Sequence, residues 1–107
     1  ISSDGQGSLP LFSPEGVFLG VGMGQSSCLL KEVKECVQKE DIPLEIAVKA
    51  ITSNPARVLC LNSKGTIETG KDADFCMLTE DLTVDTVIAM GQTMVRGGEI
   101  LVKGMFE

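Results

Sequence analysis

The sequence predicts an α/β protein in which helices are followed by a β-meander. Two patterns support this prediction. Apolar residues recur at helical spacing in the middle of the chain, up to about residue 61. After residue 62 the pattern changes to short apolar runs that are separated by glycine turns. We therefore expect a boundary near residue 62, between a helical segment and a β segment.

The first helix is expected to begin after Ser26 or Ser27, because either serine can cap it. Charged residues lie between the apolar ones in the sequence and are expected to face solvent. An i,i+4 ion pair from Glu35 to Lys39 is expected on that solvent face. The spacing places five apolar residues on the buried face: Leu29, Leu30, Val33, Cys36 and Val37.

Two shorter helices are predicted next. One begins at Asp41 as the cap, with Pro43 in its first turn, and the other begins at Asn54-Pro55. The apolar residues of the two helices are Leu44, Ala47, Val48 and Ile51, then Ala56, Val58, Leu59 and Leu61.

Four strands are predicted in the β segment. The first is the apolar run Asp74–Thr79. Three more, Val84–Met90, Thr93–Val95 and Glu99–Lys103, are separated by Gly91-Gln92 and Gly97-Gly98. Two-residue turns that contain glycine supply the positive φ that tight hairpins require, so the last three strands are expected to form a meander.

Composition excludes several classes of function. The 107 residues include 9 Lys and Arg against 15 Asp and Glu, a net charge of −6, and 43% are hydrophobic, which is enough to bury a core. No nucleic acid or membrane partner is expected, because both bind through clustered Lys and Arg. No apolar stretch is long enough to span a bilayer, so we expect a cytoplasmic protein.

The first 24 residues are rich in Gly, Ser and Pro, which predicts an irregular loop with a short extended piece at Val17–Leu19. The chain opens at Ile1 on a polar segment, and we expect its natural beginning to lie upstream. The glycine cluster Gly20–Gly24 precedes a helix, as a dinucleotide-binding fingerprint would. Its third glycine comes one residue early and no β-α-β pattern follows, so a flexible turn is the favoured interpretation.

Histidine is absent, which removes the commonest general base and the commonest metal ligand. The four cysteines contain no C-x-x-C pair, so a structural zinc site is not favoured. Cys28 and Cys36 on one helix would lie roughly 12 Å apart along its axis, too far for a disulfide. We expect free and mostly buried thiols at Cys28, Cys36, Cys60 and Cys76.

The segment Ser3-Asp4-Gly5-Gln6-Gly7-Ser8 has two interpretations. An aspartate among small residues is most simply a turn or a cap, and composition alone favours that interpretation. The alternative is an aspartate at the carboxyl end of a strand. Its glycines would then let the backbone approach a ligand, and its serine could hydrogen-bond that ligand.

The remaining motifs carry a resemblance to a known family. Thr52–Leu59 followed by Lys64–Phe75 resembles the C-terminal signature of the amidohydrolase superfamily. The opening Ser2–Ser8 and the closing Val102–Glu107 together resemble the end of the isoaspartyl dipeptidases of that superfamily. Hydantoinase and dihydroorotase relatives place a histidine soon after the corresponding aspartate, and this chain has none. The resemblance covers essentially the whole chain, but only about the last quarter of such an enzyme.

This resemblance implies a metal-dependent TIM-type (β/α)8 barrel with a small β-sandwich domain. Residues 1–61 would supply the end of the last barrel strand, the active-site loop and the terminal helices, and residues 62–107 would supply strands of the sandwich. Asp4 falls on the catalytic aspartate that ligates a metal and carries a proton. Ser8 falls on the serine that contacts the α-carboxylate of the substrate, and Gly5 and Gly7 on backbone positions of the same substrate-binding loop.

The implied activity is the cleavage of β-aspartyl dipeptides to aspartate and an amino acid by a homo-oligomeric enzyme. Two divalent metal ions, expected to be Zn2+, would lower the pKa of water toward about 7. One aspartate cannot assemble a two-metal site, so these residues alone are expected to be inactive and to expose apolar surface. The alternatives are another amidohydrolase, of hydantoinase, dihydroorotase or N-acyl amino acid deacylase type, or a non-catalytic assembly module.

Overall fold

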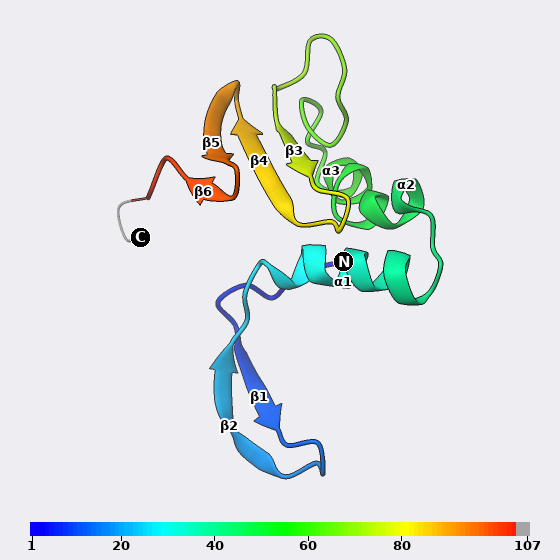
Figure 1. Cartoon of the computed structure of the whole chain (residues 1–107). Coiled ribbons are helices and arrows are strands. Elements are labelled where there is room, and N and C mark those ends of the chain that lie inside the picture. The colour runs from blue at the N-terminus through cyan, green and yellow to red at the C-terminus, as the bar shows by residue number, and fades with distance from the viewer. Residues whose placement is uncertain (105–107) are drawn as a thin grey trace. The chain divides into compact units, whose positions relative to one another are not determined.

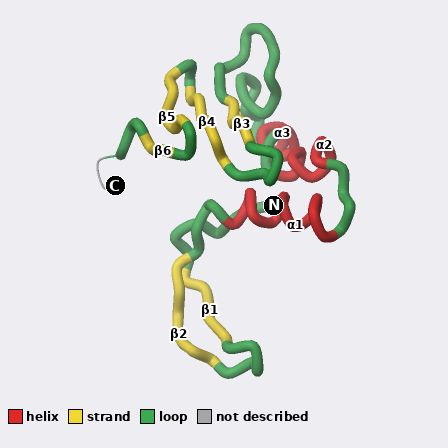
Figure 2. The backbone as a smooth tube through the Cα atoms, viewed as in Figure 1, coloured by secondary structure: helices red, strands yellow, loops and turns green. Residues whose placement is uncertain are grey.

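The structure, a computed structural model, describes residues 1–104 (Figure 1). The chain divides into two compact units, Ile1–Ile51 and the residues from Thr52 onward. Helices are followed by a four-stranded antiparallel meander, as predicted, and Figure 2 shows this order along the chain. The division between the units falls before residue 62, because the last helix groups with the strands. No helix among residues 1–104 is both long and apolar enough to cross a membrane.

A β-hairpin occupies most of the segment that was predicted to be an irregular loop. β1 (Ser8–Phe12) pairs antiparallel with β2 (Phe18–Met23), and the register runs from Ser8 opposite Met23 to Leu11 opposite Gly20. The prediction was therefore wrong for both strands, although the expected extended piece overlaps the start of β2. Pro10 is tolerated here because a two-stranded hairpin leaves one edge of each strand unpaired.

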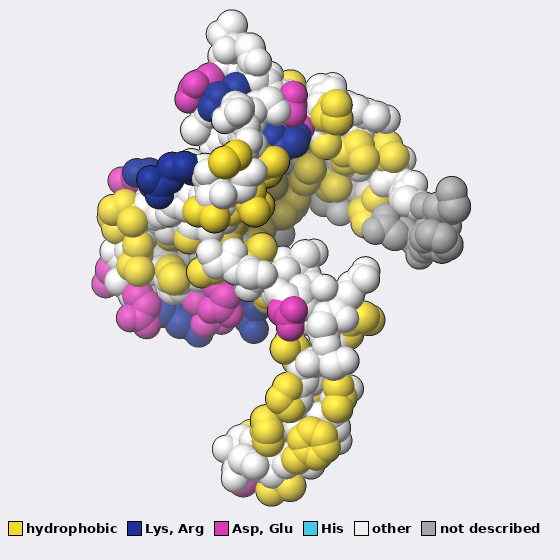
Figure 3. All heavy atoms as spheres, turned by 180° about the vertical axis from the view of Figure 1, so that it is seen from behind, with side chains coloured by type: hydrophobic (Ala, Val, Ile, Leu, Met, Phe, Trp, Pro, Cys, Tyr) yellow, Lys and Arg dark blue, Asp and Glu magenta, His cyan; other side chains and the backbone are white. Residues whose placement is uncertain are grey.

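The hairpin presents apolar side chains to solvent, as the space-filling view shows (Figure 3). The rings of Phe12 and Phe18 pack edge to face, with their centroids 5.9 Å apart. Buried apolar side chains are few among the described residues, namely Val33, Ala56 and Leu82. The expected exposure of apolar surface is therefore found, and on the hairpin it comprises Leu9, Leu11, Phe12, Val17, Phe18, Leu19, Val21 and Met23.

α1 (Cys28–Lys39) confirms the first predicted helix. Ser27 is its N-cap residue, although its side chain makes no capping hydrogen bond. Val33 is the buried residue of the apolar face, with 2% of its surface exposed. The expected ion pair is present on the other face, where Lys39 Nζ lies 3.0 Å from Glu35 Oε2.

The second helical segment begins differently from the prediction. Pro43 is the N-cap of α2 (Leu44–Ala47) and does not lie in its first turn. Asp41 is not the cap either, since it adopts a left-handed φ of 53° before the helix begins. The segment then tightens into a short 3-10 helix, η1 (Val48–Ala50).

α3 (Ser53–Val58) is the predicted third helix, with Thr52 as its N-cap. Ala56 is buried, with 8% of its surface exposed. The other three apolar residues expected on its face are exposed within the described chain: Val58, Leu59 and Leu61.

The second unit contains β3 (Phe75–Leu78), β4 (Val84–Ala89), β5 (Gln92–Arg96) and β6 (Glu99–Ile100) in sequential order. This arrangement confirms the meander. The turn between β5 and β6 is Gly97-Gly98, as predicted, and both residues have positive φ, 59° and 77°.

Two details of the meander differ from the prediction. The turn after β4 is Met90-Gly91, because Ala89 pairs with Gln92. β6 ends at Ile100, well before the predicted Lys103. The amides of Leu101 and Val102 both donate to the carbonyl of Met94, so the regular ladder ends there. Part of the closing motif, Met105–Glu107, lies outside the described residues.

A charged cluster, which we call the lysine clamp, joins Lys64, Asp72 and Asp74. Lys64 Nζ lies 2.9 Å from Asp72 Oδ2 and also forms an ion pair with Asp74. The hydrogen bonds from Lys64 hold the pKa of both carboxyl groups below its usual value, and the same bonds raise the pKa of Lys64. Asp74 Oδ1 also accepts the Met90 amide at 2.6 Å, so the clamp ties the loop before β3 to the turn after β4.

All four cysteines are free thiols. Cys28 and Cys36 are half-buried, whereas Cys60 and Cys76 are exposed. The expectation of free thiols is confirmed, but that of mostly buried thiols is wrong, since two of the four lie at the surface. Partial burial of the Cys76 thiol raises its pKa, so this group stays protonated at neutral pH.

Candidate active-site loop

Residues 3–7 form a tight loop, here called the Asp4 loop, which is closed by backbone hydrogen bonds. The amide of Gly7 donates to the carbonyl of Asp4 at 2.8 Å. The amide of Gln6 donates to the carbonyl of Gly24 at 2.8 Å, and the amide of Gly24 donates to the carbonyl of Gly7 at 2.9 Å. Gly24, seventeen positions after Gly7 in the sequence, therefore fastens the loop to the chain just after β2.

Two serine side chains complete the hydrogen bonding at the start of the loop. The Oγ of Ser2 accepts the Asp4 amide at 3.4 Å, and the Oγ of Ser3 accepts the Gly5 amide at 3.2 Å. Asp4 and Gln6 have positive φ angles of 46° and 65°. Aspartate is among the few L-residues that visit this region readily, so its presence suits the turn.

The Asp4 carboxylate lies over Gly7. A Cβ built on Gly7 would lie only 2.4 Å from Asp4 Oδ2, so any side chain at position 7 would displace the carboxylate. Asp4 is exposed, and within residues 1–104 its carboxylate accepts no hydrogen bond and forms no ion pair. Both carboxylate oxygens are therefore available to a cation, a proton or a substrate donor.

Ser8 is the first residue of β1 and is exposed. Among the described residues no hydrogen bond joins Ser8 to Asp4, so the two predicted site residues lie at the two ends of one short segment without a hydrogen bond between them. The amides of Gly5 and Gly7 are used inside the loop. The space left by the missing side chain of Gly7 is taken by the Asp4 carboxylate, and a Cβ built on Gly5 would lie 3.3 Å from Ser3 Oγ.

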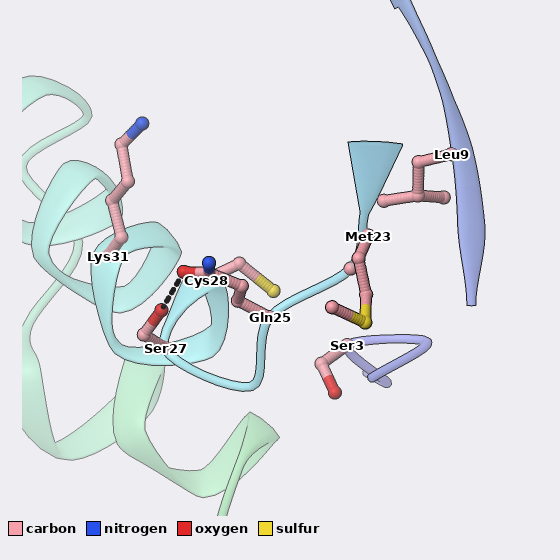
Figure 4. A pocket seen from close by; sticks show the side chains of 8 residues that line it. Ser3, Leu9, Met23, Gln25, Ser27, Cys28 and Lys31 are labelled. Atoms are coloured by element: carbon pink, nitrogen blue, oxygen red, sulfur yellow. Dashed lines mark hydrogen bonds between the residues drawn. The ribbon is translucent and has the colours of Figure 1, made fainter. Parts of the chain in front are cut away.

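Two open hollows flank the Asp4 loop, with volumes of about 480 and 550 Å³. Figure 4 shows the first, where the Cys28 sulfur, on the first turn of α1, points toward the space beside Met23, and Lys31 extends away from it. Ser27 Oγ donates to Gln25 Oε1 at 3.4 Å on its rim. Asp4 lines neither hollow, and the residues common to both are Met23, Gly24, Gln25 and Ser27.

The residues present fit one ligand position of a metal site and no more. The Asp4 carboxylate is a hard oxygen donor that no protein group among residues 1–104 engages. Within the same residues, no group of three His, Cys, Asp or Glu side chains could hold a metal ion. A complete site would need ligands from beyond residues 1–104.

Sequence reasoning missed two features of this loop. It assigned Gly24 to a flexible turn, whereas the residue is buried and makes two of the hydrogen bonds that close the loop. It also gave no role to the hydroxyl oxygens of Ser2 and Ser3. No local signal distinguishes Gly24 from the neighbouring Gly22, because the contact depends on a residue twenty positions earlier.

Solved structures are similar to this chain over most of its length. The chain is similar to a β-aspartyl dipeptidase from Fervidobacterium islandicum, solved with a β-Asp-Leu dipeptide. The identity is 36%, the TM-score 0.80, and the match covers 97% of this chain and 28% of that one. An N-acetylglucosamine-6-phosphate deacetylase from Pasteurella multocida matches at 24% identity and a TM-score of 0.63, over 81% of this chain and 22% of that one, which supports the fold alone.

Sequence comparison points to the same group of proteins. An allantoinase from Bacillus licheniformis is 47% identical over 47 residues, which are 44% of this chain and 10% of the allantoinase. The chain therefore spans only a small part of each relative. The sequence profile of the amidohydrolase family matches residues 1–94, which is most of the chain. This chain belongs to the amidohydrolase family.

Proposed function

We propose that the protein containing this chain hydrolyses β-aspartyl dipeptides and that Asp4 is a catalytic residue. The observation that carries the proposal is the Asp4 carboxylate, which has no hydrogen bond or ion pair among residues 1–104, on a loop closed by backbone hydrogen bonds. The similarity to a β-aspartyl dipeptidase over 97% of the chain supports the choice of substrate. Because the chain spans 28% of that relative, the activity is proposed for the whole protein and not for these residues alone.

The role proposed for Asp4 follows from its chemistry. One carboxylate oxygen would ligate a divalent metal ion, with zinc as the expected metal. The bound metals would supply a nucleophile by lowering the pKa of water toward about 7. Asp4 would accept a proton during attack on the side-chain amide and deliver it to the leaving amine. General acid–base transfer of this kind contributes about 10²–10⁴-fold to a rate.

Ser8 is proposed to bind the substrate. Its exposed hydroxyl can donate a hydrogen bond to the α-carboxylate of the isoaspartyl residue, and a bond to an ionised acceptor is stronger than a neutral one. Gly5 and Gly7 would let the substrate approach the backbone beside Asp4. Products would be aspartate and a free amino acid.

The finer architecture is also part of the proposal. Residues 1–61 would form the end of the last strand, the active-site loop and the terminal helices of a TIM-type barrel, and residues 62–107 strands of a small β-sandwich. The four-stranded meander supports the second assignment. The exposed apolar side chains of the hairpin fit a chain that packs against further protein, in keeping with a homo-oligomeric, cytoplasmic enzyme.

A second candidate function is an allantoinase activity. It is favoured by the 47% identity over 47 residues to the Bacillus licheniformis allantoinase. The absence of histidine in this chain argues for the dipeptidase, since the resemblance places a histidine soon after the corresponding aspartate in hydantoinase-type relatives.

The test is a substrate comparison with the full-length, zinc-loaded protein. We expect release of leucine from β-Asp-Leu, with α-Asp-Leu as the matched control that differs only in which carboxyl group forms the amide. Cleavage of allantoin with β-Asp-Leu left intact would contradict the proposal and favour the second candidate. Equal cleavage of the α- and β-linked dipeptides would contradict the specificity assigned to the loop.

A further inference from the structure

We infer that Gly24 is a positioning residue for Asp4: the absence of a side chain at position 24 fixes where the Asp4 loop, and with it the carboxylate, lies. The catalytic consequence rests on the proposed function, whereas the structural part does not. Gly24 is buried and lies between the end of β2 at Met23 and the start of α1 at Cys28. It therefore couples the loop to a segment held at both ends by regular structure.

The contact between Gly24 and Asp4 leaves no room for a methyl group. A Cβ built on Gly24 would lie 2.5 Å from the Asp4 carbonyl oxygen and 3.3 Å from both the Asp4 carbonyl carbon and the Ser3 carbonyl oxygen. These are backbone atoms, so relief would require the Asp4 peptide plane to move. The tip of a flexible side chain, by contrast, could simply rotate away.

A shift of the Asp4 carbonyl would reach the carboxylate through Gly7. The carbonyl of Asp4 accepts the Gly7 amide, and the carboxylate of Asp4 lies over Gly7. Gly24 itself accepts the Gln6 amide and donates to the Gly7 carbonyl. The same residue therefore sets the spacing of the loop and makes two of its closing hydrogen bonds.

Gly22 supplies a matched control two positions away. The three atoms nearest to a Cβ there all belong to the Leu11 side chain, at 3.1 to 3.2 Å, and that side chain can adjust. Neither Gly22 nor Gly24 has a positive φ, so an alanine is compatible with the backbone angles at both positions. The two substitutions add the same methyl group, which would contact backbone atoms at position 24 and a flexible side chain at position 22.

The first arm of the test measures amide hydrogen exchange by NMR on the full-length protein. In the unsubstituted protein we expect the Gln6 and Gly24 amides to be protected, since both are donors in the closing bonds. Gly24→Ala should speed exchange at Gln6 by at least about tenfold, whereas Gly22→Ala should leave it unchanged. Gln6 and Gly24 amides that exchange at unprotected rates in the unsubstituted chain would overturn the inference, even if Gly24→Ala failed to fold.

The second arm measures steady-state kinetics of the full-length protein on whichever amide substrate it cleaves. A displacement of about 1 Å in a catalytic group can cost about 100-fold, so Gly24→Ala should lower kcat by about that factor with little change in KM. Gly22→Ala should retain the kcat of the unsubstituted protein. Equal kcat for the two variants would overturn the positioning role. Failure to cleave β-Asp-Leu would instead overturn the proposed function and leave the exchange arm decisive.

Discussion

Two loops of this chain each carry aspartates, and they use them in opposite ways. The Asp4 loop is closed by backbone hydrogen bonds and by serine oxygens, and its carboxylate has no partner among residues 1–104. The loop before β3 is held by its carboxylates, since Asp72 and Asp74 both engage Lys64.

This contrast separates a carboxylate that is free for chemistry from two that are already engaged by a cation. A carboxylate that already accepts hydrogen bonds from a cation is stabilised in its charged form, and its release would cost those bonds. The pKa of Asp72 and Asp74 is accordingly held down by Lys64. Asp4 carries no such bonds, so it can take up a metal ion or a proton without breaking a protein contact.

The largest effect is expected from Asp4→Asn in the full-length protein. Hydrolysis of β-Asp-Leu should fall by about 10²–10⁴-fold, because the amide can neither carry the proton nor replace an anionic ligand. The melting temperature should change little, since the carboxylate makes no hydrogen bond or ion pair among residues 1–104 and asparagine also tolerates the left-handed backbone. Asp72→Asn is the matched control and should show the reverse, a lower melting temperature with unchanged hydrolysis. Equal loss of activity in the two variants would contradict the claim that Asp4 serves catalysis and Asp72 serves stability.

Next in size is the loss of the clamp cation. Lys64→Met should lower the melting temperature, followed by circular dichroism, because it leaves the carboxylates of Asp72 and Asp74 close together without a counter-charge. Lys71→Met is the control, since Lys71 lies 3.6 Å from Glu68 and pairs with a single carboxylate. If both variants melt at the temperature of the unsubstituted protein, the clamp does not hold its loop.

The contribution of the lysine clamp to stability should be lost at both low and high pH. The pKa of Asp72 and Asp74 lies below the ordinary 3.8, so their contribution is full above 3.8 and is lost as pH falls further. The pKa of Lys64 lies above 10.5, so its contribution is full below that value and is lost at higher pH. Unfolding curves should therefore show a clamp contribution that is constant between these limits and absent in Lys64→Met. A contribution that changes across neutral pH would contradict this assignment.

The smallest effect is expected from a charge pair outside both loops. Glu35→Gln removes the exposed pair with Lys39, and solvent screens such pairs strongly. The change in melting temperature should be too small to resolve and should not depend on salt. A drop comparable to that of Lys64→Met would show that a single exposed ion pair stabilises its unit as much as the two-carboxylate clamp stabilises the second unit.

The elements that a local residue pattern specifies were predicted from the sequence. The β1–β2 hairpin, whose strands are specified by their pairing with each other, was not. α1 follows from apolar spacing around Val33, and the turn at Gly97-Gly98 follows from the φ angles that glycine allows. The hairpin β1–β2 has no clear alternation and contains Pro10, so its strands are specified by their mutual register. Pattern alone could not reveal it.

The residues of the candidate site likewise differ in whether the sequence could predict them. Asp4 and Ser8 were predicted as site residues through a family resemblance, while composition alone favoured a simple turn. Gly24 could not be found from sequence, because its role depends on a backbone contact with Asp4 across the hairpin.

The most direct test of the account is the position of the Asp4 carboxylate relative to metal in the full-length protein. Anomalous diffraction at the zinc edge should show zinc within coordination distance of an Asp4 oxygen, about 2.0–2.2 Å. Zinc bound elsewhere, with the Asp4 carboxylate directed into solvent, would contradict the proposed role of this residue.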